Sequence, residues 1–115
     1  PVWLPDGKSV VFTSNIEDGK TYNLYLTDFH GKSARKLTHE KDGAVYYFPS
    51  VEATGSRIWF SLAKDEKAVI GYVTTDGEYK EVAEGRDGAI SPDGTTIAFT
   101  KRVGKGFPLF VMDAD

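Results

Sequence analysis

The residues of this 115-residue chain whose chemistry suits ligand or partner contact lie in short, charged connections. The longest connection, residues 39–48, combines an imidazole with two phenols among acidic and basic neighbours. Aromatic side chains are enriched at protein interfaces, and surface loops tend to carry function. The candidates for a partner-binding loop face are His39, Tyr46, Tyr47, Arg86 and Arg102. The competing interpretation is that one tyrosine packs against a neighbouring part of the core while the charges form a solvated rim.

No motif for catalysis, a metal or a cofactor stands out in the sequence. A Gly-x-Ser-x-Gly nucleophile elbow is absent, two histidines leave few options for a Ser-His-Asp triad, and there is no cysteine. His39 and Glu40 lack the second histidine of a zinc-hydrolase helix. Asp113 and Asp115 could open a calcium loop, but a strand end followed by a turn is the favoured interpretation. We therefore expect no catalytic residue, no metal and no cofactor in this chain.

Composition narrows the class of protein and of partner. The chain carries 14 Lys and Arg against 17 Asp and Glu, a net charge of −3, which argues against a nucleic-acid partner. No apolar run is long enough for membrane insertion. A hydrophobic content of 40% and 12 glycines indicate a folded, turn-rich protein. The absence of cysteine is compatible with any compartment.

An internal repeat predicts the elements that position these residues. Residues 1–13, 49–61 and 88–100 align without a gap, and each has a glycine followed by an apolar segment with a phenylalanine. Further short segments follow in phase, at 23–28, 70–76 and 109–113 and then at 35–38 and 80–83. All are short, rich in β-branched and aromatic residues, and bounded by turn residues, which is typical of strands.

These segments predict an all-β fold made of β-propeller blades with four antiparallel strands each. The second strand of each repeat is apolar on both faces, as in Val10, Val11 and Phe12, so each sheet should be covered on both sides. Radial stacking of blades has this property. A β-sandwich is the structural alternative, but it does not predict a three-fold repeat in phase.

The sequence resembles the TolB-like (Pro-Asp-Gly type, WD-like) β-propeller repeat family. The resemblance rests on Ser91–Gly94, Ile97–Thr100 and Val111–Asp115, and it extends over nearly the whole chain. The middle repeat departs from the pattern with Ala53-Thr54-Gly55 in place of Pro-Asp-Gly. The resemblance implies a periplasmic or otherwise extracytoplasmic setting, although the residues themselves are compatible with the cytoplasm. It is specific for fold and says little about function.

Counting strands predicts about three blades, with the last one incomplete. The expected division of the partial propeller domain, 1–115, is blade 1 at 1–48, blade 2 at 49–88 and blade 3, without its outer strand, at 89–115. A closed propeller has about four to eight blades. We therefore expect two open apolar faces, covered by the remainder of a larger propeller or by a second copy of the chain.

Consecutive antiparallel strands should place the connections between blades and between second and third strands on one loop face. We expect this face to bind a protein partner, which makes the chain a non-catalytic scaffold, in the cell envelope by resemblance. The alternative is the substrate-gating propeller of a prolyl-oligopeptidase-type or tricorn-type peptidase, with its catalytic residues outside this chain. A carbohydrate-active propeller is a third possibility that no residue specifically favours.

Overall fold

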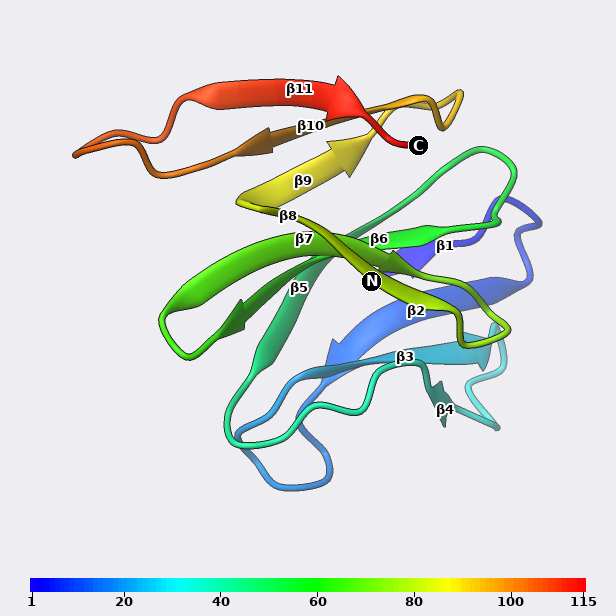
Figure 1. The fold of residues 1–115 in the computed structure, drawn as a ribbon. Coiled ribbons are helices and arrows are strands. Elements are labelled where there is room, and N and C mark those ends of the chain that lie inside the picture. The colour runs from blue at the N-terminus through cyan, green and yellow to red at the C-terminus, as the bar shows by residue number, and fades with distance from the viewer.

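The chain folds into three antiparallel sheets, and a computed structural model describes all residues, 1–115. The strands are β1 (Val2–Trp3), β2 (Ser9–Ser14), β3 (Asn23–Asp28), β4 (Arg35–Lys36), β5 (Val45–Val51), β6 (Ile58–Lys64), β7 (Lys67–Val73), β8 (Tyr79–Glu84), β9 (Arg86–Ile90), β10 (Thr96–Thr100) and β11 (Leu109–Asp113). We call the sheet β1-β2-β3-β4 blade 1, the sheet β5-β6-β7-β8 blade 2 and the sheet β9-β10-β11 blade 3. Figure 1 shows blade 2 between the other two, and no helix that could span a membrane is present.

The turns that join the first two strands of each blade have the chemistry that the sequence predicts. Gly7 in blade 1 has a φ of 69°, and Gly94 in blade 3 has a φ of 74°. Asp93 accepts a backbone N–H two residues ahead at 3.0 Å, as turn aspartates do. Blade 2 lacks the Pro-Asp-Gly sequence, yet Gly55 takes the same left-handed conformation, with a φ of 73°. Glycine adopts this region without steric cost, so it preserves the turn where the preceding residues change.

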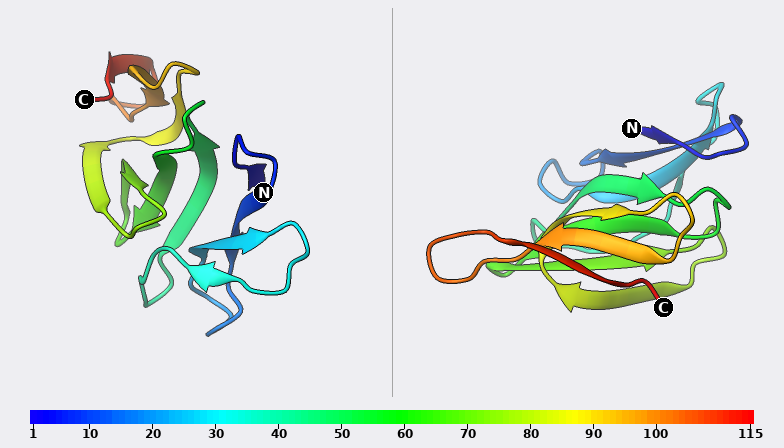
Figure 2. Two further views of the ribbon diagram at one scale, coloured as in Figure 1. Left: turned by 90° about the vertical axis from the view of Figure 1, so that its right-hand side faces the viewer. Right: turned by 90° about the horizontal axis from the view of Figure 1, so that it is seen from above.

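Blade 2 is buried on both faces because blade 1 packs on one face and blade 3 on the other (Figure 2). Ile58, Phe60 and Leu62 of β6 lie in the core shared with blade 1. Trp59, on the opposite face of the same strand, lies in the core shared with blade 3. The two-sided burial predicted for the second strand is thus confirmed in β6. In blades 1 and 3 the equivalent strands pack only one face on blade 2.

The faces of blades 1 and 3 that point away from blade 2 are open. Trp3 of β1 is 57% exposed, and Leu109 and Val111 of β11 are 69% and 62% exposed. Val111 pairs with Ala98 of β10, so it lies on the face opposite the buried side chains of Ile97 and Phe99. The expectation of two open apolar faces is confirmed, and the three sheets do not close into a ring.

The boundaries expected between residues 48 and 49 and between 88 and 89 fall inside strands. β5 begins at Val45 and β9 begins at Arg86. Each strand contains an irregularity near the expected boundary: the register shifts between Tyr47 and Ser50, and Asp87 has a φ of 57°. A bulge breaks the alternation of side chains, so the residues before it do not look like part of the same strand in the sequence.

Candidate functional site

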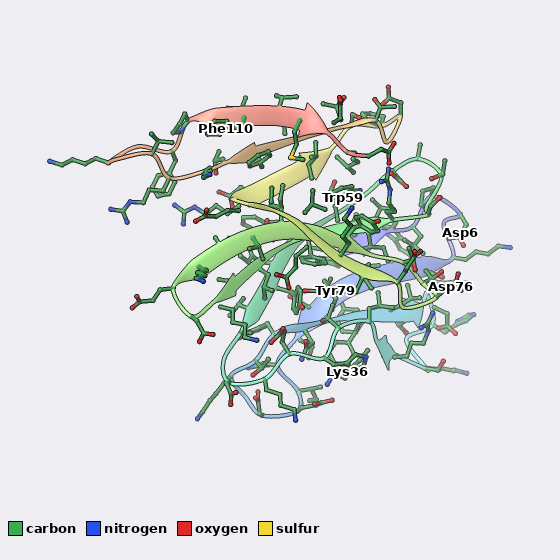
Figure 3. All side chains as sticks on the ribbon, in the orientation of Figure 1. Asp6, Lys36, Trp59, Asp76, Tyr79 and Phe110 are labelled. Carbon is green, nitrogen blue, oxygen red and sulfur yellow. The ribbon has the colours of Figure 1, made fainter.

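The connections that carry the candidate residues gather at one end of the sheets. The connections β2–β3, β6–β7 and β10–β11, together with β4–β5 and β8–β9, lie toward the left of Figure 1. Figure 3 labels Asp6 and Asp76, which mark the opposite end, where the β1–β2 and β7–β8 turns lie. Successive strands run antiparallel, so this separation of the two ends follows from the strand order. We call the end with the candidates the loop face.

A groove on the loop face lies where blades 2 and 3 meet. It has a volume of about 250 Å³ and is lined by Glu66, Lys67, Ala68, Glu84, Gly85, Arg86, Lys101, Arg102 and Phe107. We call it the basic groove, because four cationic side chains face two carboxylates among these residues. Both blades contribute: β7 and the β8–β9 connection on one side, the β10–β11 connection on the other.

Local backbone geometry explains how the groove residues are placed. Asp65 and Glu66 have φ values of 51° and 64°, as a two-residue hairpin turn requires, and this turn leads into Lys67. Gly85 has a φ of 151°, and a Cβ on it would lie 2.5 Å from the Phe99 ring. Glycine at this position therefore lets the chain cross close over blade 3 before it enters β9 at Arg86.

The guanidinium group of Arg86 is the central feature of the basic groove. Its central carbon lies 3.9 Å from the centroid of the Phe107 ring, a close cation–π contact. Its Nε atom is buried and has no hydrogen-bond partner, and no carboxylate lies within salt-bridge distance. Arg102 is exposed and donates Nε–H to the carbonyl of Gly104 at 3.2 Å. Neither arginine is neutralised by an acidic side chain of the chain itself.

Tyr47 lies beside the basic groove. It lines an adjoining groove of about 380 Å³ that also includes Arg86 and the β6–β7 turn. Burial raises the pKa of the Tyr47 phenol, and the nearby charge of Asp87 raises it further, while the charge of Arg86 lowers it. Three of the five candidates, Tyr47, Arg86 and Arg102, are therefore gathered along one continuous part of the loop face.

His39 and Tyr46 are not part of this cluster. His39 is exposed and lines a separate groove of about 400 Å³ between the outer strands of blades 1 and 2. Tyr46 is only 1% exposed and lies in the core, with its hydroxyl 2.9 Å from that of Tyr79. Burial raises the pKa of Tyr46 to about 12. Tyr46 is thus the tyrosine that packs inward, since alternation along β5 turns it toward blade 1 and Tyr47 toward the opposite face of the sheet, and Tyr46 also lines the groove that holds His39.

Phe107 is the groove residue that was missed in the sequence. It lies in the charged, glycine-containing β10–β11 connection, outside the phased repeat. An aromatic residue in an otherwise polar hairpin connection is a signal that could have identified it. No group of three or more His, Asp or Glu side chains is placed to hold a metal ion. The cluster can bind a partner noncovalently, through the guanidinium groups of Arg86 and Arg102 and the aromatic ring of Phe107.

Comparison with known proteins gives a structural match only. No family model and no curated protein matches the sequence. A solved structure of TolB from Acinetobacter baumannii superposes with a TM-score of 0.75 over 94% of this chain, at 16% identity. A solved structure of putative TolB from Agrobacterium tumefaciens superposes with a TM-score of 0.82 over 95% of this chain, at 22% identity. The fold is that of TolB propeller blades.

The TolB fold confirms the β-propeller architecture that the repeats and the family resemblance predict. The chain spans 28% and 40% of the lengths of these two TolB structures. At these identities the likeness concerns the fold, so the role of the loop face has to be argued from the residues of this chain.

Proposed function

We propose that this chain is a segment of a TolB-like propeller that acts as a non-catalytic scaffold, binding a protein partner through its loop face in the cell envelope. The fold likeness to TolB supports the type of scaffold, and the family resemblance supports the envelope setting. The observation that carries the binding role is the basic groove, where Arg86 and Arg102 are both without an acidic partner. Arginine and aromatic side chains are the groups that most often anchor protein interfaces.

The opposite end of the sheets is a poorer candidate because its polar groups are satisfied locally. Asp6 accepts the backbone N–H of Lys8 at 2.8 Å, and Asp28 accepts that of His30 at 3.0 Å. These are short turns whose side chains stabilise their own backbone. The loop face differs in having two arginines without a carboxylate partner on one groove, one of them 3.9 Å from an aromatic ring.

Site-specific photo-crosslinking tests the binding role. We would place p-benzoylphenylalanine at Lys105, in the exposed β10–β11 connection, or at Asp6, at the opposite end. In envelope fractions of the source cells, we expect a discrete crosslinked product from position 105 that excess unlabelled chain suppresses, and none from position 6. Equal crosslinking from both positions, or none from either, contradicts the proposal.

The open faces of blades 1 and 3 point to a second kind of partner. We propose that the rest of a propeller, or a second copy of the chain, covers the exposed side chains of Trp3, Leu109 and Val111. Size-exclusion chromatography with light scattering separates these cases. A dimer supports closure between copies, and self-association into larger aggregates supports a need for further blades. A stable monomer contradicts both, since large apolar faces would then persist in water.

A further inference from the structure

We propose that the basic groove binds a segment of the protein partner that carries neighbouring Asp or Glu side chains, with Arg86 and Arg102 as its carboxylate contacts. This proposal rests on the proposed function and names the chemistry of the partner. It draws on the charges within the groove, the geometry of one guanidinium group and the size of the groove.

Three cationic side chains elsewhere in the molecule, Lys36, Arg57 and Lys64, form close ion pairs within the chain. Lys36 lies 2.9 Å from a Glu17 carboxylate oxygen, and Lys64 lies 2.6 Å from one of Glu40. In the basic groove the only ion pair joins Lys101 to Glu84 at 3.9 Å, a distance at which an exposed pair contributes little. With four cationic and two acidic side chains in its lining, and neither arginine in an ion pair, the groove has an excess of positive charge.

The guanidinium group of Arg86 is oriented for binding a carboxylate. Its central carbon lies over the Phe107 ring, 3.9 Å from the ring centroid, so this ring occupies one side of the group. The edge of a guanidinium is the part that binds both oxygens of a carboxylate. None of its N–H groups donates a hydrogen bond within the chain, and the Nε atom is buried. A buried donor without a partner is uncommon in folded proteins, and it shows that this guanidinium group has few acceptors within the chain.

The size and the mixed charge of the groove favour an acidic segment over other anions. Its volume of about 250 Å³ lies below the roughly 300–1,000 Å³ of small-molecule pockets. Glu66 and Glu84 line the groove as well, and they would repel a stiff, continuous polyanion such as a nucleic acid, whereas a flexible peptide can turn its remaining carboxylates toward solvent. A single terminal carboxylate would engage one arginine and leave the other unpaired. Two neighbouring carboxylate side chains can engage both.

Fluorescence polarisation with defined peptides tests the proposal on the chain itself. The probe is a fluorescein-labelled hexaglutamate peptide with an amidated C-terminus. We expect it to bind with an affinity that falls as salt concentration rises. The matched peptide, hexaglutamine with an amidated C-terminus, should not bind. Hexaglutamine with a free C-terminal carboxylate distinguishes a terminal from a side-chain carboxylate. Binding of that peptide as tight as that of hexaglutamate would overturn the proposal, as would displacement of hexaglutamate by an equal concentration of inorganic phosphate.

Variants locate the binding in the groove. Arg86→Gln and Arg102→Gln should each weaken binding by about tenfold, the loss expected when a charge-assisted hydrogen bond is removed. Arg86→Lys should also weaken hexaglutamate binding, because lysine keeps the positive charge but lacks the planar guanidinium group and its paired N–H donors. The matched control is the double variant Lys8→Gln/Lys32→Gln, which removes two charges from the opposite end and should bind as the original chain does.

Four further outcomes separate the acidic segment from the scaffold role. If the groove variants bind hexaglutamate as tightly as the control does, the proposal is overturned. If Arg86→Gln fails to fold, the exposed Arg102→Gln and the free-carboxylate peptide still decide the question. Crosslinking from position 105 without hexaglutamate binding would leave the scaffold role intact and reject only the acidic segment. Absence of both would reject the proposed function as well.

Discussion

Arg57 joins blade 2 to blade 3, and replacing it with methionine tests how the blades are held together. Its guanidinium group donates to both carboxylate oxygens of Glu52, at distances of 3.0 to 3.2 Å. It also donates to the carbonyl of Gly94 at 2.8 Å and to that of Ala114 at 3.3 Å, both in blade 3. Its central carbon lies 5.3 Å from the ring centroid of Trp59. One side chain thus crosses the boundary between two sheets.

The expected magnitude follows from the burial of the acidic partner. Glu52 is 4% exposed, so Arg57→Met leaves a carboxylate buried without its cation. Removing one partner of a buried ion pair typically lowers the free energy of unfolding by about 3–5 kcal/mol. The double variant Glu52→Met/Arg57→Met removes both charges, and apolar residues of similar volume often replace such a pair at little net cost. The double variant should lose less than about 2 kcal/mol, mostly from the missing bonds to blade 3 carbonyls.

Urea unfolding measures both variants. Circular dichroism follows the strands, and the fluorescence of Trp59, the buried tryptophan of the two, follows the boundary between blades 2 and 3. Arg57→Met should shift the midpoint to lower urea, and the double variant should restore most of the loss. A loss below about 1 kcal/mol for Arg57→Met, or a double variant less stable than the single one, would refute the idea that a buried carboxylate depends on Arg57.

Three other predictions concern packing and titration. Phe60 is 2% exposed and lies between blades 1 and 2. Phe60→Ala should lower the free energy of unfolding by about 3–5 kcal/mol. The half-buried Phe12 is the matched control, and an equal cost for both in urea unfolding would contradict this packing. Hydrogen bonds from the backbone N–H and hydroxyl of Thr21 and the backbone N–H of Lys20 lower the pKa of Asp18 to about 2. An NMR titration should show the pKa rise part of the way toward 3.8 in Thr21→Val, which loses only the hydroxyl bond, but not in Thr21→Ser. Since the folded pKa is lowered, this contribution is present above pH 3.8 and is lost as pH falls through about 2. Burial raises the pKa of Tyr46 to about 12 from 10.0, so the unfolded chain loses its proton first and stability should fall between those pH values. Tyr46→Phe should flatten this dependence in urea unfolding measured at several pH values; an unchanged slope would contradict it.

The strands were the most predictable part of the molecule. The segments expected at 23–28 and 109–113 coincide with β3 and β11, because alternating apolar residues and flanking turn residues act locally. The segment expected at 70–76 was displaced, since β7 spans Lys67–Val73. Lys67 and Ala68 join this strand because they pair with the end of β6 across a tight hairpin turn, which their own side chains do not signal.

The candidate site was only partly predictable. The sequence placed Tyr46 and Tyr47 together and left open which of them packs inward. The side-chain alternation of β5 decides this, and a bulge beginning at Phe48 obscures that alternation in the sequence. His39 was grouped with Arg86 on the ground that both lie in connections between blades. The structure places them on separate grooves, because each connection leaves from a different pair of sheets.

The sequence by itself determined the repeat, the turns, the strand type and the two-sided burial of the central blade. These depend on residues close together in the chain, whose backbone preferences and alternation are local properties. Only the tertiary structure decided that Arg86 stacks on Phe107 and that Arg57 reaches Glu52 and the carbonyl oxygens of blade 3. The Arg57 contacts join two sheets and depend on how these pack against each other, whereas the Arg86 contact depends on how the β10–β11 connection lies over the start of β9 in the same sheet. Packing is a property of the whole core, so no local pattern of residues specifies it.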